Sequence, residues 1–420
     1  MRLAGLAAAR RGFSDPSFPG LSVHILLLNQ YFPPDTSATA KIAATMAEAL
    51  SVRHRVTVLA GRPSYDPSER HPYYLWRREL RGNLTVERVG STTYPRFQMW
   101  RRVSNYLSYL ALAVPRALAI RADIVLAMTD PPVEGIAGAI VAKLTGRPFV
   151  YNIQDLYPDM ALGGAIVPPS PWVEIWESLH QRALRRAALV IVLGEDMRDR
   201  IIAKGVDPGR VVIVRAGAAL PERTPAADDP VAREIRCGFP FVVLHAGNLG
   251  FYGAWDTLVR AARLLEHDGV GFVFVGDGAV KPQIEASAAG CPAVRFLPFR
   301  PPQEIPCVLA AGDIHVVTVR RGLEGVVVPS KLYPILAAGR PVLAVAPEES
   351  DVARIVRRTG CGVVTDPDNP MALAEAVRAL SRDPQRVVEM GRRAREIAPS
   401  YDKVKQLEIF VQLIEEATRK

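Results

Sequence analysis

The chain has 420 residues, 49% of them hydrophobic, and a formal net charge of +9. A single hydrophobic core usually stops growing at about 250 to 300 residues, so the length predicts two domains and the composition excludes a disordered chain. No apolar run reaches the roughly 20 uninterrupted residues of a membrane-spanning helix, because the best segment, 107–119, contains Pro115 and Arg116.

The amino-terminal half alternates between predicted strands and helices. Residues 1–20 place three arginines and two prolines around Ala/Leu stretches, which is typical of a short targeting leader or an over-long start, so the fold is expected to begin after them. Continuous apolar runs between helical patterns indicate strands buried on both faces, hence a parallel sheet with helices on each side. The predicted elements are a strand at 23–28, a loop at 29–39, a helix at 40–50, and strands at 56–60, 124–128, 149–153, 189–193 and 211–214.

The alternation restarts after a Pro/Ala/Asp-rich stretch at 221–230, which predicts a linker. We therefore expect a first domain at 21–220, a second domain at 231–400, and a carboxy-terminal helix at 401–420 that is long enough to cross back to the first domain. The predicted strands are 241–245, 272–275, 294–297, 314–319, 342–346 and 362–364, and the predicted helices are 254–266, 280–288, 331–338, 370–381 and a tail at 385–420.

Two sheets of this kind in tandem determine where a ligand would bind. Open α/β sheets bind ligands in crevices at the carboxyl ends of their strands. If the domains face each other, loops from both sheets line one cleft, which suits a reaction between two substrates held away from water. The predicted fold class is α/β, with two Rossmann-like doubly wound domains facing across a cleft.

The positive charge is concentrated in the first half. Residues 1–220 carry 27 Lys and Arg against 18 Asp and Glu, and eleven arginines fall between Arg62 and Arg121 among tyrosines and tryptophans. This stretch fits an anionic membrane surface at the inner face of a membrane or a phosphate-bearing acceptor, although a solvated basic face over an ordinary amphipathic helix explains it equally well. No nucleic-acid-binding motif accompanies the charge, so nucleic acid is not expected. The four cysteines lack zinc-ligand spacing, so no metal is expected and a cytoplasmic setting fits.

Two glycine-rich turns in the second half could bind phosphate. The sequence HAGNLG at 245–250 follows an apolar strand and precedes a helix, so its glycines can bring backbone amides close to a diphosphate. Such turns are often purely structural. The sequence FVGDG at 274–278 repeats the arrangement, with Lys281 three residues further on. Two such turns in one domain favour a phosphate site more than either turn alone.

A third segment, 329–343, has the residues of a capped helix followed by a strand. Ser330 is expected to cap the helix amino terminus, with Lys331 beside the free first-turn amides and Gly339 at the helix end. A helix amino terminus with a hydroxyl and an ammonium can hold a diphosphate. Taken alone, an ordinary capped helix with a surface lysine is an equally good interpretation.

Together these segments resemble glycosyltransferase family 4, the retaining enzymes with the two-Rossmann GT-B fold. The resemblance covers residues 22–400 and depends on the order of its motifs. The PSKL segment at 329–332 is similar to that of the bacterial envelope-polysaccharide branch that includes the N-acetyl-L-fucosamine transferases. The other motifs are QYFPPDTSA at 30–38, QDLYP at 154–158, AALVIVLGEDM at 187–197, GNLG at 247–250, VGDG at 275–278, LP at 297–298 and LAAGRPV at 336–342.

The resemblance implies transfer of a sugar from a nucleoside-diphosphate sugar, a UDP-sugar in particular, to a lipid-linked or polysaccharide-precursor acceptor. The second domain would hold the donor and the first the acceptor, with no cofactor and no metal. Asp155 is implied as the catalytic polar group at the reacting sugar, and Ser37 and Ala38 as an interdomain loop near the diphosphate. The implied donor-binding residues are Gly247, Asn248, Leu249, Gly250, Lys281, Leu297, Pro298, Glu324, Ser330, Lys331 and Leu332.

The sequence departs from the family pattern at two places. Many members have a His-Asp pair where this chain has Gln154 and Asp155. Their Glu-x7-Glu motif would place its glutamates at Val326 and Pro334. Glu324 restores the first glutamate with a two-residue insertion, whereas the second has no equivalent, so its ribose contact is missing or comes from elsewhere.

The chemistry and two alternatives follow from these residues. Transfer with retention needs no protein nucleophile, because the leaving diphosphate can take the proton of the attacking hydroxyl, so the enzyme positions groups and stabilises charge. A sugar-nucleotide epimerase or hydrolase on the same fold would need acid/base groups, for which His245 is the candidate histidine. A catalytically degenerate nucleotide-sugar-binding protein would explain the missing histidine and glutamate. A dinucleotide dehydrogenase is disfavoured, since 29–37 lacks GxGxxG.

Overall fold

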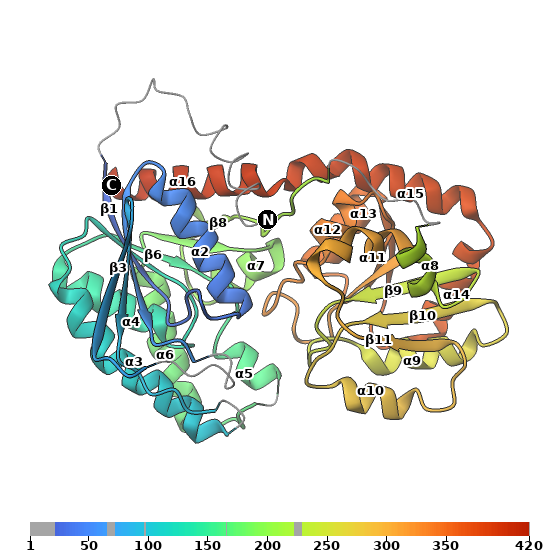
Figure 1. The fold of residues 1–420 in the computed structure, drawn as a ribbon, viewed down its shortest axis with the longest axis horizontal. Helices are drawn as coiled ribbons and strands as arrows, with labels where there is room; N and C mark the ends of the chain where they lie inside the picture. The colour runs from blue at the N-terminus through green and yellow to red at the C-terminus, as the bar shows by residue number, and fades with distance from the viewer. Residues whose placement is uncertain (1–21, 65–71, 96–97, 165, 222–228, 420) are drawn as a thin grey trace.

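The computed structural model describes residues 22–64, 72–95, 98–164, 166–221 and 229–419. In this part of the chain two α/β domains lie side by side, each around its own sheet (Figure 1). The prediction of two Rossmann-like doubly wound domains is confirmed. The predicted leader at 1–20 and most of the predicted linker at 221–230 lie outside the described residues.

The first domain contains an eight-stranded sheet with the order β3-β4-β2-β1-β5-β6-β7-β8. Its neighbouring strands are parallel except for β3 and β4, which are antiparallel. The strands are β1 (His24–Leu28), β2 (Arg55–Gly61), β3 (Trp76–Arg81), β4 (Leu84–Val89), β5 (Ile124–Ala127), β6 (Phe149–Asn152), β7 (Leu189–Val192) and β8 (Val211–Ile213). The helices are α2 (Ala38–Ser51), α3 (Met99–Ala119), α4 (Glu134–Thr145), α5 (Asp159–Gly163), α6 (Pro171–Arg186) and α7 (Glu195–Ala203).

Strand β1 shows why an uninterrupted apolar run forms the centre of this sheet. Ile25 and Leu27 pack into one core cluster and Leu26 and Leu28 into another, because successive side chains point to opposite faces. Both faces are covered by helices, so each position must be apolar.

The hairpin of β3 and β4 is missing from the predicted elements. Strand β3 is the edge of the sheet, and its sequence WRRELR is mostly exposed, so it lacks the apolar run that marks the other strands. Strand β4 is buried but carries charges, of which Glu87 accepts a hydrogen bond of 2.6 Å from Nε of Arg116. Much of the basic stretch from Arg62 to Arg121 is therefore this hairpin and α3.

The second domain contains a six-stranded parallel sheet with the order β11-β10-β9-β12-β13-β14. The strands are β9 (Phe241–Ala246), β10 (Val270–Val275), β11 (Val294–Leu297), β12 (Ile314–Thr318), β13 (Val342–Val345) and β14 (Gly362–Thr365). The helices are α8 (Pro230–Arg236), α9 (Trp255–Leu264), α10 (Lys281–Ser287), α11 (Ile305–Ala311), α12 (Leu332–Ala337), α13 (Asp351–Thr359), α14 (Pro370–Ser381) and α15 (Pro384–Ile397). The last helix of the chain is α16 (Lys403–Arg419), which packs on the first domain.

The carboxy-terminal tail differs from the single helix predicted at 385–420. It forms α15 and α16, separated by a short 3-10 turn, Ala398–Tyr401, that contains Pro399, a residue that interrupts helical hydrogen bonding. Helix α16 lies across the first domain, where Phe410 and Ile414 join the core cluster of Ile25 (Figure 1).

The chain crosses twice between the domains, and the crossings are adjacent. The amide of Ala218 donates to the Tyr401 carbonyl at 3.0 Å, and the amide of Lys403 donates to the Ala218 carbonyl at 3.0 Å. This backbone pairing joins the two crossings to each other.

Candidate functional site

The turn after β9 brings three segments of the second domain together. Gly247 has a φ of +127°, and its amide donates to the Val275 carbonyl at 2.8 Å. A Cβ on Gly276, whose φ is +147°, would lie 2.1 Å from the Gly247 carbonyl oxygen. A Cβ on Gly247 would lie 2.5 Å from Cε of Lys331. The predicted glycine turns are thus stacked backbone on backbone, and the side chain of Lys331 lies directly on the first of them.

The ammonium of Lys331 is held by oxygens of this turn. Its Nζ donates to the Asn248 carbonyl at 3.1 Å and to the Tyr252 hydroxyl at 3.1 Å, and it lies 5.3 Å from the centre of the Tyr252 ring. Burial alone lowers the pKa of Lys331 to about 8. Among the described residues no carboxylate forms an ion pair with it, although a buried cation normally has a counter-ion. The turn therefore presents a partly buried positive charge whose hydrogen-bond partners among the described residues are neutral.

Ser330 does not cap helix α12, contrary to the prediction. The helix begins at Leu332, and the cap position belongs to Lys331, which has helical angles of φ −62° and ψ −24° and makes no side-chain capping bond. A capping hydroxyl must come from an extended residue immediately before the helix, and Ser330 is one position too early. Ser330 is exposed, and Leu332 is buried in the core of the second domain.

The other residues implied for the donor lie around the same edge of the sheet. Leu249 is buried, and its amide donates to the Asp277 carbonyl at 2.8 Å. Leu297 accepts a bond of 2.9 Å from the Gly276 amide, and Pro298 next to it is exposed. Lys281, at the start of α10, has its ammonium 3.8 Å from a carboxylate oxygen of Glu285 on the same helix.

Asp155 lies where the first domain meets the second. It forms an isolated antiparallel bridge with Val327, and the next amide, that of Leu156, donates to the Val326 carbonyl at 3.1 Å. Burial, and then the negative charge of Asp130, raise the pKa of Asp155 to about 7. The backbone of the predicted catalytic residue is thus fixed against the segment that leads to Lys331.

Glu324 and the Ser37 loop lie apart from Lys331. The carboxylate of Glu324 accepts from the Gly322 amide at 2.7 Å and lies 3.6 Å from Arg200 of α7, so it pairs with the first domain. The Ser37 hydroxyl caps α2, accepting from the Ala40 amide at 3.0 Å, and Ala38 is exposed. Within the described part of the chain, neither side chain forms one of these polar contacts with the Gly247 turn.

The structure weakens the role of His245 as an acid/base group. His245 is 1% exposed, and its ring lies edge-on to Trp255 with centroids 4.8 Å apart. Burial, followed by the charge of Lys331, holds its pKa well below the usual range. A neutral imidazole enclosed by aromatic rings cannot exchange protons with a substrate at the surface of the turn.

Tyr252 is the residue of this site that the sequence analysis did not identify. It lies within a Gly-rich segment, but the lysine that it contacts is 79 positions further along the chain, so no local pattern marks it. Its hydroxyl also donates to the Asn248 carbonyl at 2.8 Å.

A depression of the described surface lies away from these residues. It measures about 1020 Å³ at the amino ends of the second sheet and is lined by Phe241, Arg340, Val387 and Arg395 among others. No residue implied for the donor or for catalysis lines it.

Over the described ranges, no helix has the length and apolar character needed to cross a bilayer. The same residues bring together no cluster of His, Cys, Asp or Glu suited to a metal ion.

Both domains match known protein families. Residues 37–217 match the family described as "Glycosyl transferase 4-like domain", and residues 240–383 match "Glycosyl transferases group 1". The chain is 28% identical to the Pseudomonas aeruginosa protein named "Probable glycosyltransferase WbjE" over 62% of this chain and 66% of that protein. It is 24% identical to WcaI of Escherichia coli, a protein named for colanic acid biosynthesis, over 84% of this chain and 91% of WcaI.

Solved structures share the fold at lower identity. HepE of Anabaena, in complex with UDP, aligns with a TM-score of 0.68 at 19% identity, covering 94% of this chain and 100% of HepE. Sucrose-phosphate synthase of Thermosynechococcus elongatus aligns with a TM-score of 0.70 at 15% identity, covering 94% of this chain and 98% of that enzyme.

Proposed function

The chain is a glycosyltransferase of the GT-B fold, made of a glycosyl transferase 4-like domain and a group 1 glycosyl transferase domain, and we propose that it uses a UDP-sugar as donor. The proposed acceptor is a lipid-linked sugar or another polysaccharide precursor, because WcaI is named for colanic acid biosynthesis. The PSKL segment favours a specificity like that of the N-acetyl-L-fucosamine transferases. The UDP that HepE binds supports the choice of donor base.

The observation that carries this proposal is the Lys331 ammonium on the Gly247 turn. It is partly buried and bonded to the carbonyl of Asn248 and the hydroxyl of Tyr252, and none of the described carboxylates pairs with it. A partly buried cation without a counter-ion is stabilised when an anionic ligand completes the site. A diphosphate on the turn would supply that charge.

In the proposed reaction the enzyme positions two sugars and stabilises charge on the leaving diphosphate. As the bond from the sugar to the diphosphate breaks, the acceptor hydroxyl forms the new bond on the same face and its proton passes to a diphosphate oxygen. One preorganised hydrogen-bond donor such as the Lys331 ammonium can lower the barrier of this step by about 3 kcal/mol. Asp155, with a pKa of about 7, would donate or accept a hydrogen bond at the reacting sugar near neutral pH.

A thermal-shift screen of nucleotide-sugars, followed by transfer to polyprenyl-diphosphate-linked sugars in detergent, tests the function. We expect a UDP-sugar to stabilise the protein and one acceptor to give product. Lys331→Ala should lower turnover roughly 100-fold while folding normally. Lys143→Ala, an exposed lysine on α4, is the matched control.

Three results would contradict the proposal. Near-wild-type transfer by Lys331→Ala would remove Lys331 from the donor site. Donor binding without transfer to any acceptor would favour the catalytically degenerate binding protein. Release of free nucleotide, or of an isomerised sugar nucleotide, without an acceptor would favour a hydrolase or an epimerase.

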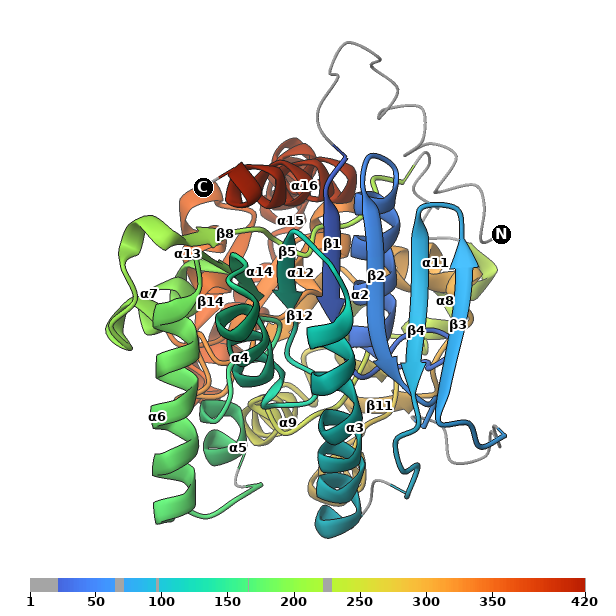
Figure 2. The same ribbon diagram turned by 90° about the vertical axis from the view of Figure 1, so that its left-hand side faces the viewer.

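We also propose that the first domain docks on an anionic membrane surface. Helix α3 exposes Met99 (44%), Trp100 (61%) and Leu107 (61%), and α6 exposes Trp172 (79%). The two helices extend to the same end of the first domain (Figure 2). Exposed aromatic and aliphatic side chains on a domain rich in arginine match the apolar and electrostatic parts of bilayer binding. This surface would bring a lipid-linked acceptor to the protein.

A further inference from the structure

Tyr252 contacts the Gly247 turn and the Lys331 ammonium beside it through both its hydroxyl and its ring. The hydroxyl donates to the Asn248 carbonyl at 2.8 Å and accepts from Lys331 Nζ at 3.1 Å. The ring centre lies 5.3 Å from the same Nζ, within the range of a cation–π interaction. The ring also occupies space left by Gly250, where a Cβ would lie 2.5 Å from Tyr252 Cε1. The side chain is thus packed against the turn, with its hydroxyl and ring toward the ammonium.

The protonation of Tyr252 fixes the direction of these hydrogen bonds. Burial raises the pKa of Tyr252 to about 12, so the hydroxyl stays neutral at physiological pH. Its single proton is used by the Asn248 carbonyl, which leaves the oxygen lone pairs to accept from Lys331. The hydroxyl and the Asn248 carbonyl are therefore the two acceptors that hold the ammonium.

The loop that carries Tyr252 also contacts the first domain. The Tyr252 carbonyl accepts from the Arg320 amide at 2.7 Å, and the Arg320 guanidinium donates to the Gly163 carbonyl of α5. A Cβ on Gly164 would lie 2.7 Å from Cε2 of Phe251. The position of Tyr252 is thus linked to the contact between the domains.

We propose that Tyr252 is a positioning residue that holds the Lys331 ammonium over the Gly247 turn before the donor binds. The arriving diphosphate would meet an ammonium that is already in place, so little ordering remains to oppose binding. This role rests on the proposed function, in which Lys331 contacts the diphosphate. The contact between the Tyr252 hydroxyl and the Lys331 ammonium can itself be tested in protein without donor.

The first test uses Tyr252→Phe, which keeps the ring and removes one acceptor of the ammonium. The rate at which an amine-reactive reagent labels Lys331 is followed against pH by peptide mass spectrometry, in protein without donor. Removing an acceptor destabilises the charged form, so the midpoint of labelling should move to lower pH in Tyr252→Phe. Tyr73→Phe, which removes the same atom from an exposed tyrosine of the first domain, should leave the midpoint unchanged. An unchanged midpoint in Tyr252→Phe overturns the proposal.

The second test is a double-mutant cycle with Lys331→Met, read as KM for the UDP-sugar. Tyr252→Phe alone should raise KM roughly tenfold, since the ammonium would then have to be ordered as the donor binds, and should change kcat less. In the Lys331→Met background the same substitution should have almost no effect on KM. Tyr252 would have only a structural role if Tyr252→Phe changed KM equally in both backgrounds, or if it lowered thermal stability and left KM unchanged. If the wild-type protein binds no nucleotide-sugar, the proposed function fails, while the labelling midpoint still decides whether Tyr252 holds Lys331.

Discussion

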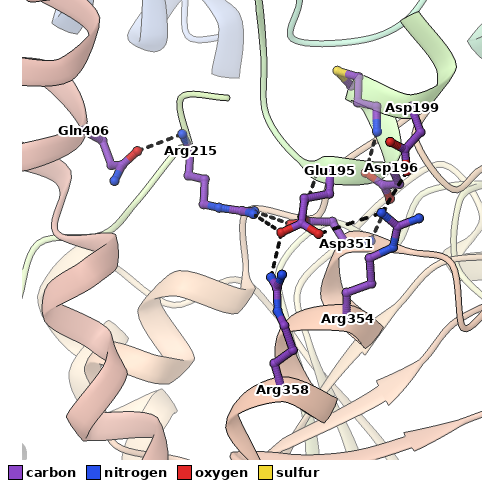
Figure 3. A network of polar contacts seen from close by, with 9 residues as sticks. Glu195, Asp196, Asp199, Arg215, Asp351, Arg354, Arg358 and Gln406 are labelled. Atoms are coloured by element: carbon purple, nitrogen blue, oxygen red, sulfur yellow. Dashed lines mark hydrogen bonds and ion pairs between the residues drawn. The ribbon is translucent and has the colours of Figure 1, made fainter. Parts of the chain in front are cut away.

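Asp196 and Asp351 cap each other's helices across the boundary between the two domains. Asp196 Oδ2 accepts from the Asp351 amide at 2.9 Å, and Asp351 Oδ1 accepts from the Glu195 amide at 2.9 Å (Figure 3). Helices α7 and α13 thus meet at their amino termini, where carboxylates satisfy free amides and interact favourably with the helix dipoles. Arg215, near the crossing at Ala218, donates to the Asp351 carboxylate and neutralises part of this negative charge. The network fixes one relative orientation of the domains.

Asp351→Ala should lower the free energy of unfolding by about 3 kcal/mol, because it leaves Arg215 without its main counter-ion in a nearly buried site. The side chains of Asp351 and Arg215 are 1% and 12% exposed. Urea denaturation measures the loss. Asp199→Ala is the control, since its pair with Arg354 has side chains 52% and 32% exposed and should contribute about 1 kcal/mol or less. Equal stability of the two variants would refute a structural role for the network.

The contribution of Asp155 to the stability of the protein should fall as pH rises from about 4 to 7. Its pKa in the folded protein is raised from 3.8 to about 7, so between these values the folded state holds a proton that the unfolded state has lost. A carboxyl with a raised pKa therefore destabilises the fold above pH 7, by roughly 1.4 kcal/mol for each pH unit that separates its folded and unfolded pKa values. Asp155→Asn should match the wild type in urea denaturation at pH 4 and be more stable at pH 8. A variant less stable than the wild type at pH 8 would contradict a raised pKa for Asp155.

The same carboxyl should make Asp155→Asn a poor enzyme although it is more stable. If Asp155 contacts the reacting sugar, the variant should lose kcat while the KM for the donor changes little. Unchanged kcat would leave Asp155 as an interdomain packing residue.

The sequence predicts the parts of this molecule that depend on local pattern. Strands such as β1 are identified because both faces are covered, whereas β3 is missed because an edge strand needs no apolar run. The Gly247 turn and Lys331 are predicted from residue type at a strand end and near a helix start. The roles of Tyr252 and Asp351 are not predicted from the sequence, because their partners Lys331 and Asp196 lie 79 and 155 positions away along the chain. Only the tertiary structure brings these residues together.

Gly247→Ala should weaken donor binding because the new methyl group would displace the side chain of Lys331. The new Cβ would lie 2.5 Å from Lys331 Cε, and φ at this position is +127°, so the ammonium must move. Gly290→Ala meets nothing within 4 Å and has a φ of +76°, so it imposes backbone strain alone, at a cost of about 1 kcal/mol. Calorimetric titration with the UDP-sugar should show at least a tenfold weaker affinity for Gly247→Ala and wild-type affinity for Gly290→Ala. Equal affinities would show that the turn lies outside the donor site.

Binding to anionic vesicles should depend on both charge and exposed tryptophan. Burial of a large apolar side chain contributes about 1.5 to 3 kcal/mol, so Trp100→Ala and Trp172→Ala should each weaken vesicle binding roughly tenfold. Met371→Ala, 61% exposed on the second domain, should have no effect. The attraction of arginines to anionic lipid is screened by salt, so wild-type binding in a sedimentation assay should weaken as ionic strength rises. Salt-insensitive binding, or no binding, would mean that the basic surface of the first domain only keeps the protein in solution. The acceptor would then have to reach the site without a docked membrane.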